Sequence, residues 1–345
     1  MTANATPAPA AAPATTAPSS TTAFRMPRRP GWMTIAGKEL SDHVLSIRFY
    51  VLMIVLGIAA LIPLYFAADR IRALAPAVSG APAVFLAMFV LGPDADTGPI
   101  PFTVQGFVAM TAPLLGVAFA FDSVNGERHQ GTLPRLLSQP IHRDDVINGK
   151  FAAGLAIITL GLTAVVLVVA GFGMLRLAIM PTPDELIRLI LWFGVTLLYV
   201  GLWLAFGLLL SVVIRRAATS ALVGFGVWLF LAIPIAGPLL VRLLGAFLAS
   251  GATTASEYYG TIQWVQRLLP GQLYAEATTA LLSPGTTSVS ASDVYSVNAL
   301  PSQSTLLTFD QSLLLIWPQL VILFALMVGC FALAYVRFMR QEVRA

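Results

Sequence analysis

The side chains that could do chemistry gather in one polar stretch, GERHQGTLPRLLSQPIHRDDVINGK, which runs from Gly126 to Lys150. Glu127 could act as a general acid or base, but no second carboxylate or metal ligand lies at a spacing that would support it. The three histidines of the chain are far apart and have no cysteine or carboxylate at ligand spacing, so we expect no metal site. They are His43, His129 and His142.

Two lysines follow a glycine, as the lysine of a phosphate-binding loop does. A loop of the form G-x4-G-K-[ST] needs a hydroxyl residue directly after the lysine, to reach magnesium. Phe151 follows Lys150 and Glu39 follows Lys38, so neither site qualifies. We therefore expect the chain to be no enzyme by itself and to bind neither ATP nor another cofactor.

The composition around this stretch is that of an integral membrane protein. Hydrophobic residues make up 57% of the chain and charged residues 10%, against about 45–50% and about 25% in soluble proteins. The net charge of +4 comes from basic residues scattered along short loops. Because they form no sustained patch, we expect the partner surface to be a lipid bilayer and not a nucleic acid.

Six charge-free runs are long enough to cross about 30 Å of hydrocarbon, which takes about 20 helical residues. They are Phe49 to Ala68, Thr97 to Phe121, Phe151 to Leu175, Leu189 to Ile214, Ala217 to Val241 and Gln311 to Val336. A seventh run, 73–93, is broken by Pro76, Gly80 and Pro82, and only its part from Val84 is strongly apolar. That part is too short to span.

The basic residues indicate the direction of the spans, since lysine and arginine near span ends favour the cytoplasm. With six spans and a cytoplasmic start, 14 of the 20 basic residues lie inside. Counting 73–93 as a further span would leave the majority outside. We therefore predict six spans, both termini in the cytoplasm, and residues 126–150 on the cytoplasmic side between spans two and three.

The flanks of the spans divide into three segments. Residues 1–30 are rich in Ala, Pro and Thr and predict a disordered tail before a single domain, 31–345. Residues 31–48 predict an amphipathic helix in the inner headgroup layer, although a loose basic flank of the first span is the alternative. The loop 242–310 contains helical patterns that fit either short helices dipping into the outer leaflet or an external cap.

The amphipathic prediction for 31–48 rests on two sets of residues. One side carries Met33, Ala36, Leu40, Val44 and Ile47, and the other carries Lys38, Glu39, Asp42 and Ser46.

The polar stretch itself predicts a short helix. Gly131 ends the preceding helix, Thr132 can cap a new one, and Pro134 suits its first turn. Pro140 stops it about two turns later. Its leucines share one face, and a helix this short is not stable alone in water, so it must dock either on the protein's own span ends or on a cytosolic partner.

The stretch resembles the E-x3-G-T-L-x2-L-L-S-x-P-I-x-R-x5-G-K signature of ABC-2 type transporter permeases. The matching residues are Glu127, Gly131, Thr132, Leu133, Leu136, Leu137, Ser138, Pro140, Ile141, Arg143, Gly149 and Lys150. GKELSDHVLS near the N-terminus and RLLPGQLYAEATTALLSP before the last span also resemble segments of that family. The resemblance implies a coupling helix that fits a groove on a separate ATP-hydrolysing subunit, which would hold ATP and magnesium.

The resemblance also implies roles for these residues. Leu133, Leu136 and Leu137 would be apolar contacts in the partner's groove, and Arg135 would contact its rim. Glu127 and Arg143 would fix helix ends by hydrogen bonds or ion pairs. The full predicted ATPase-coupling interface is Glu127, Gly131, Thr132, Leu133, Arg135, Leu136, Leu137, Ser138, Pro140, Arg143 and Lys150, and the interfacial-helix residues are Lys38, Glu39, Leu40 and Asp42.

The span interiors contain no ionisable residue, which argues against a proton-driven carrier. Candidates for the transport pathway or a dimer contact are instead polar, aromatic and small residues. They are Gln105, Ala221, Gly224, Phe225, Gly226 and Trp228.

Together these features predict an all-α membrane protein with six spans, an interfacial helix, a coupling helix and a helical outer loop. The expected function is that of a permease subunit in the cell membrane, working as a homodimer with an ABC ATPase to export a hydrophobic or amphipathic substrate. A secondary-active carrier, a membrane-embedded enzyme and an assembly scaffold are the alternatives.

Overall fold

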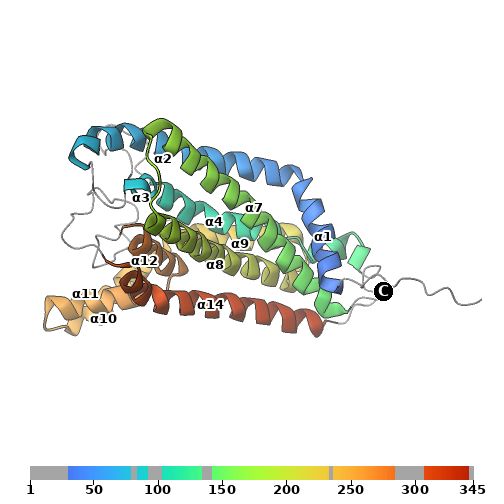
Figure 1. Ribbon diagram of the computed structural model, residues 1–345. Coiled ribbons are helices and arrows are strands. Elements are labelled where there is room, and N and C mark those ends of the chain that lie inside the picture. The colour runs from blue at the N-terminus through green and yellow to red at the C-terminus, as the bar shows by residue number, and fades with distance from the viewer. Residues whose placement is uncertain are drawn as a thin grey trace, which may run out of the picture.

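The computed structural model describes residues 30–78, 84–91, 103–133, 142–232, 236–283 and 307–341. Within these ranges the secondary structure is entirely helical and no strand forms. The long helices lie side by side in one elongated bundle (Figure 1). The expected all-α class is confirmed, and of the predicted tail only Pro30 falls within the described ranges.

Among the described residues, five helices are long and apolar enough to cross a membrane. They are α2 (Ile47–Val78), α4 (Val104–Ala120) with the short α5 (Asn125–His129) that continues it, α7 (Arg143–Leu177), α8 (Pro183–Val213) and α14 (Phe309–Met339). A bent pair, α9 (Ala217–Ala232) with α10 (Gly237–Leu248), makes a sixth if it is counted as one span. Several helices run past the apolar segments that predict them, because hydropathy marks only the part in hydrocarbon.

The fifth span differs from the continuous helix expected over Ala217 to Val241. The helix is bent by 51° between α9 and α10. Pro234 lies in this interval, and its missing N–H favours a break. A Cβ on Gly237 would lie 2.7 Å from the carbonyl oxygen of Phe230. The close approach of the start of α10 to the end of α9 therefore requires a glycine at this position.

The start of α8 shows how local sequence sets a helix boundary. The Thr182 hydroxyl accepts a hydrogen bond from the backbone N–H of Glu185, and the Glu185 carboxylate accepts one from the N–H of Thr182 at 2.8 Å. Pro183 occupies the first turn, where its missing N–H costs nothing. Glu185 also accepts a hydrogen bond from the N–H of Phe85, at 2.7 Å, which ties α3 to the same point.

Helix α8 is the centre of the bundle and packs against α4, α12 and α14. Small residues permit the closest approach, because helices in lipid associate by tight packing and not by exclusion of water. A Cβ added to Gly116 of α4 would lie 2.7 Å from the backbone nitrogen of Leu204, and one added to Gly207 of α8 would lie 2.9 Å from the Cβ of Ala120. The two backbones are therefore almost in contact.

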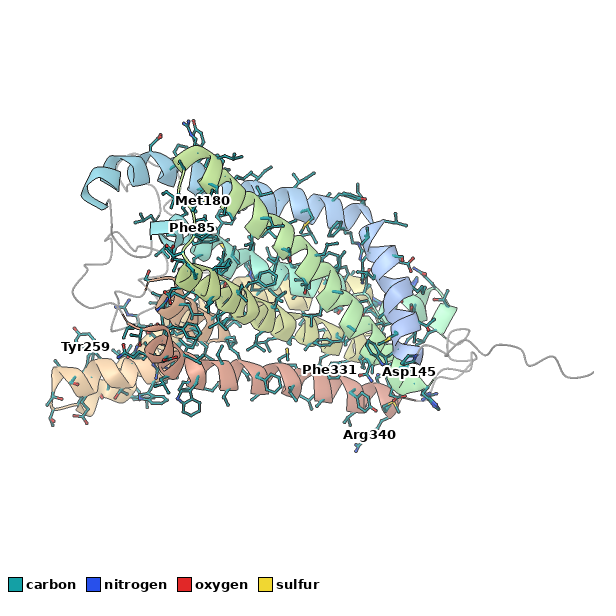
Figure 2. The ribbon with its side chains drawn as sticks, in the orientation of Figure 1. Phe85, Asp145, Met180, Tyr259, Phe331 and Arg340 are labelled. Carbon is teal, nitrogen blue, oxygen red and sulfur yellow. The ribbon has the colours of Figure 1, made fainter. Side chains whose placement is uncertain are left out.

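The bundle has two distinct ends (Figure 1). The α1 end carries α1 (Gly31–Val44), α5, the start of α7 and the end of α14. The α12 end carries α3 (Val84–Val90), α12 (Pro270–Leu282) and a hairpin made by α10 and α11 (Ala255–Gln266). Figure 2 shows Asp145 and Arg340 at the first end and Tyr259 at the second.

Two short helices at the α12 end pack into the bundle. Helix α3 has 7 residues and its Phe85 and Phe89 are fully buried, in agreement with the prediction that this run is too short to span. Helix α12 is buried from Gln272 to Leu282, and packs against α8 and α14. The sequence analysis leaves open a helix dipping into the outer leaflet or an external cap, and the burial of α12 among the long helices is compatible with the first.

Helix α1 forms where the interfacial helix is expected, but its faces differ from the prediction. Ile35 and Glu39 are its buried residues, and they face α7. Met33, predicted on the apolar side, is exposed on the bundle surface, as a lipid-facing residue would be, whereas Glu39, predicted on the polar side, is enclosed. The reason is an ion pair across the helix interface, because a buried carboxylate is tolerated only with a partner.

We predict that Gly116→Ala destabilises the bundle by about 1–3 kcal/mol, because the new methyl group meets the backbone of α8. The midpoint of thermal unfolding in detergent should fall. Gly194→Ala is the matched control, since nothing lies within 4 Å of the added Cβ there. Equal midpoints for the two variants would contradict the close packing described for α4 and α8.

Candidate coupling site

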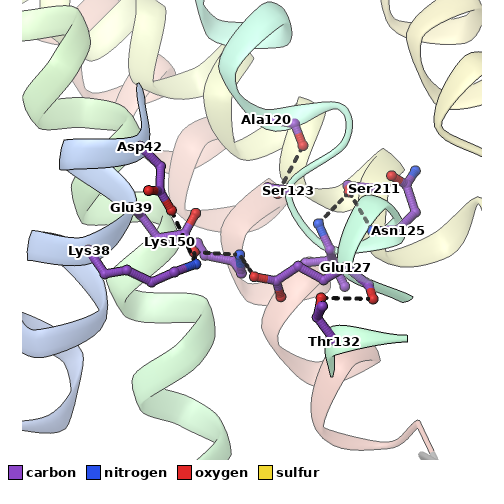
Figure 3. Close-up of polar contacts among 11 residues, drawn as sticks. Lys38, Glu39, Asp42, Ala120, Ser123, Asn125, Glu127, Thr132, Lys150 and Ser211 are labelled. Carbon is purple, nitrogen blue, oxygen red and sulfur yellow. Dashed lines mark hydrogen bonds and ion pairs between the residues drawn. The ribbon is translucent and has the colours of Figure 1, made fainter. Parts of the chain in front are cut away.

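Three charged side chains meet at the α1 end (Figure 3). The ammonium nitrogen of Lys150 lies 2.8 Å from Oε1 of Glu127 and 3.1 Å from Oε1 of Glu39. The Lys150 side chain is only 2% exposed. These residues come from α7, α5 and α1, so one buried ammonium group joins three helices.

Lys38 adds a second cation on the outer side of the cluster. Lys38 lies 3.2 Å from Glu39 and 3.3 Å from Asp42, and its own side chain is 55% exposed. Burial alone would raise the pKa of Glu39, but the attraction of Lys150 and then of Lys38 outweighs this effect and holds the pKa below its ordinary value. Glu39 is thus ionised at neutral pH, and the buried charges are paired.

Within the polar stretch, the chain turns at Gly131, directly after α5. Its φ of 69° lies in the left-handed region, which favours glycine. The Thr132 hydroxyl donates a hydrogen bond to the Glu127 carbonyl oxygen, at 3.2 Å, across this turn. The middle of the predicted coupling helix lies outside the described residues, namely Arg135, Leu136, Leu137, Ser138 and Pro140.

Leu133 is placed differently from the prediction. It is 1% exposed, so its side chain belongs to the interior of the chain and presents no apolar surface to a groove on a partner. Helical spacing predicts that Leu133 shares a face with Leu136 and Leu137. Spacing fixes which residues share a face, but it does not fix which way that face points.

Residues near both ends of the polar stretch hold it to neighbouring helices. Arg143 donates a hydrogen bond to the backbone carbonyl of Gln341, at 3.1 Å, and Arg128 bonds the Gln341 side chain. The Gln341 amide in turn donates to the carbonyl of Val212 at the end of α8, at 2.9 Å. The expected role of Arg143, fixing a helix end, agrees with this contact. No motif in the sequence marks Gln341 as an anchor.

Two further contacts complete the site. The Asp145 carboxylate accepts a hydrogen bond from the backbone N–H of Trp32, at 3.1 Å, and so holds the start of α1 against the start of α7. The Ser211 hydroxyl accepts hydrogen bonds from the N–H groups of Val124 and Asn125, at 2.9 Å and 3.2 Å (Figure 3). The second contact ties the junction of α4 and α5 to α8.

The candidate pathway residues make contacts within the chain. Gln105 donates hydrogen bonds to Thr278 and Thr279 of α12, and Trp228 donates one to the carbonyl of Met110. A Cβ on Gly224 would lie 2.7 Å from Val117, so Gly224 serves the packing of α9 on α4 and not a dimer contact.

The other three candidates lie on the same helix. The Phe225 ring packs near that of Phe121, whereas Gly226 is exposed and a Cβ there would meet nothing within 4 Å. Ala221 is half-buried.

A buried carboxylate lies where the sequence analysis expected none. Glu276 of α12 is 2% exposed and accepts hydrogen bonds from Arg267 at 2.8 Å, Gln272 at 3.0 Å and Gln319 at 2.9 Å. It was missed because it belongs to the loop before the last span. The inward packing of α12 brings it among the membrane helices.

The sequence of the chain matches the profile of a known protein family over most of its length. A profile described as ABC-2 family transporter protein matches residues 33–343. The chain belongs to this family. It is therefore a multi-pass membrane protein of an ABC transporter family, and the match includes α1, the polar stretch, α12 and α14.

Two curated relatives carry the name "Probable ABC transporter permease protein NosY". The one from Stutzerimonas stutzeri is 29% identical over 154 residues, which are 42% of this chain and 53% of that protein. The one from Pseudomonas aeruginosa is 29% identical over 140 residues, 38% of this chain and 49% of that protein. The chain thus spans about half the length of the curated relatives it matches.

We predict that Lys150→Met lowers the free energy of unfolding by about 3–5 kcal/mol, because it leaves Glu39 and Glu127 buried without their shared cation. Thermal unfolding in detergent measures the loss. Adding Glu127→Gln to Lys150→Met should restore part of the stability by removing one uncompensated charge. Lys38→Met, at an exposed position, is the control, and a loss as large as that of Lys150→Met would refute a special role for the buried cluster.

Proposed function

We propose that this ABC-2 family protein is the membrane subunit of an exporter whose ATP hydrolysis occurs on a separate nucleotide-binding subunit. The observation that carries the proposal is the Lys150–Glu127 ion pair. It joins the two ends of the polar stretch, so the residues between them form a closed loop with a rigid base. A partner that presses on such a loop moves its base as one unit.

The contacts around the base support a mechanical role. Lys150 passes a displacement to α7, Glu127 passes it to α4 through α5, and Glu39 passes it to α1. Arg143 connects the same base to the end of α14 through Gln341. Because all three contacts are hydrogen-bonded or ionic, a push at one point is shared by four helices, α1, α4 with α5, α7 and α14, instead of bending one.

The partner in this proposal is an ABC ATPase, which would carry both ATP and magnesium. Leu136 and Leu137 are the apolar contacts that would enter its groove, each contributing about 1.5–3 kcal/mol when fully buried. Arg135 would lie at the rim. The name permease on both relatives and the family membership support such a division of labour.

In this proposal the α1 end faces the cytoplasm of the cell. Arg215, Arg216, Arg337 and Arg340 are exposed at that end, as the charge rule requires for a cytoplasmic face. Two copies would form a homodimer, with the exposed Gly226 and the half-buried Ala221 as candidate contacts on α9. The apolar span interiors suit a hydrophobic or amphipathic substrate moving outward.

A secondary-active carrier is the second candidate, and Glu276 favours it. Buried carboxylates among membrane helices often take part in proton coupling. In this chain, however, the Glu276 carboxylate accepts hydrogen bonds from Arg267 and two glutamines, so its oxygens are already occupied by partners within the chain. Substrate uptake by the purified chain alone in vesicles with a pH gradient would support a carrier, and a strict need for the ATPase and ATP would exclude it.

We predict that Leu136→Asp reduces recovery of the ATPase subunit at least tenfold when the chain is purified in mild detergent from its host, because a charge would enter an apolar groove. Ser41→Asp is the matched control, since it adds the same charge at an exposed position of α1. Membrane insertion of both variants should be normal. Full ATPase recovery and ATP-driven transport by Leu136→Asp would refute the coupling role.

We predict that a cysteine at Thr253, in the turn of the α10–α11 hairpin, reacts from outside intact cells with a thiol reagent that cannot cross the membrane. Cys330, the single native cysteine, is first changed to serine. A cysteine at Ser41 of α1 should react only after lysis. The reverse pattern would invert the proposed orientation.

A further inference from the structure

We propose that four arginines at the α1 end bind the phosphate group of an anionic phospholipid in the leaflet around that end. They are Arg128 of α5, Arg143 of α7, Arg215 just after α8 and Arg337 of α14, which we name the arginine cluster. This inference rests on the membrane location of the chain and does not depend on the partner ATPase or on the direction of transport.

The arginine cluster is assembled around Gln341, at the end of α14. Arg143 donates a hydrogen bond to the Gln341 carbonyl oxygen, at 3.1 Å, and Arg128 bonds the oxygen of its side-chain amide. The amide nitrogen of Gln341 donates to the carbonyl of Val212, at 2.9 Å, so the end of α8 reaches the same point. Arg337 lies one helical turn before Gln341, where the two side chains are neighbours. Figure 1 shows the end of α14 beside the start of α7.

The positive charge of the arginine cluster is not neutralised within the part of the chain that the structure describes. Arg215 lies close enough to Arg128 for the two cations to repel each other. No described carboxylate forms an ion pair with any of the four arginines. The carboxylates of this end have other partners, since Asp122 binds Arg48, Glu127 binds Lys150 and Asp145 binds the N–H of Trp32. Cations held together in this way favour an anion from outside the chain.

The arginine cluster lies at the depth of lipid headgroups. The last apolar run ends at Val336 and Arg337 follows it directly, as Arg215 follows the run that ends at Ile214. Gln341 lies five residues past Val336, which is about 7 Å along a helix. Headgroups occupy about 5–7 Å on each side of the hydrocarbon. The guanidinium groups that meet at Gln341 are therefore within reach of lipid phosphates.

Exposed apolar side chains adjoin the arginine cluster on its hydrocarbon side. Leu333 and Val336 of α14 are 62% and 44% exposed, and Val213 at the end of α8 is 50% exposed. Leu333 precedes Arg337 by one helical turn, so the two lie on the same face of α14. A phospholipid can therefore lay its acyl chains along α14 while its phosphate lies among the arginines. An acidic surface of a cytosolic partner would match the arginines but not the apolar side chains next to them, so the combination favours a lipid.

The chemistry of the guanidinium group indicates which class of lipid binds. Arginine forms paired hydrogen bonds with phosphate oxygens and keeps its charge at any physiological pH. A lipid with a net negative charge is attracted by all four arginines, whereas the choline group of phosphatidylcholine would bring a further cation among them. Phosphatidylglycerol, which has one phosphodiester and no cation, is the simplest ligand of this class.

Equilibrium binding of a fluorescent phosphatidylglycerol tests the proposal. The full-length chain is purified in an uncharged detergent and freed of native lipid, and the probe carries its fluorophore at the end of an acyl chain. We expect saturable binding that weakens about fivefold in Arg215→Gln and in Arg337→Gln, the factor by which one arginine strengthens attraction to an anionic lipid. Arg242→Gln is the matched control, because Arg242 is exposed at the α12 end, and this variant should bind as the unchanged chain does.

Competition identifies the ligand. Unlabelled phosphatidylglycerol should displace the probe at a concentration at least tenfold lower than phosphatidylcholine does. Displacement by inorganic phosphate as effective as that by phosphatidylglycerol would show a site for free anions, and an equal loss of binding in Arg242→Gln would show a general attraction of basic side chains for the lipid. Unchanged binding in both Arg215→Gln and Arg337→Gln, or loss of the lipid whenever the ATPase subunit is bound, would likewise overturn the proposal.

Discussion

The arrangement of the α1 end depends on one buried ammonium group. Lys150 forms ion pairs with two carboxylates that are separated by more than eighty residues in the chain, and it is the buried cation that they share. Since Glu39 and Glu127 lie on different helices, the same ammonium group holds α1 in place and closes the polar stretch. Local helix propensity contributes little to either.

This cluster differs from the helix packing in the centre of the bundle. Between α4 and α8 the backbones approach closely because Gly116 and Gly207 have no side chains, so steric shape sets the distance between the two helices. At the α1 end the helices are joined by ion pairs between long side chains. The protein thus has a closely packed centre and an ionic junction where we propose that force enters.

The sequence predicted what hydropathy and helix-breaking residues control. The main spans, the short α3 and the presence of α1 follow from apolar length and from residues such as Thr182 and Pro183. The sequence did not predict the direction in which a helix face points. Glu39 reads as a surface residue because its neighbours Lys38 and Asp42 are polar, and only a lysine 111 positions away shows why it is buried.

Other features depend on contacts that no local pattern records. Gln341 gives no signal as an anchor, since its role comes from Arg128 and Arg143 far earlier in the chain. The helical pattern of α12 was visible, but its place in the bundle was not, because a half-apolar helix can cover a surface as well as enter a core. The break in the fifth span could have been foreseen from Pro234 followed closely by Gly237.

The burial of α12 imposes an order on biosynthesis. Its polar side chain Glu276 needs Gln319, which lies on α14 and is made 43 residues later. Until that helix leaves the translocation machinery, α12 can pack only against helices made before it, namely α8, α3 and α4. The last long helix, α14, therefore completes the packing around α12. A nascent chain that stalls before α14 would leave Glu276 within the bundle without its partner Gln319.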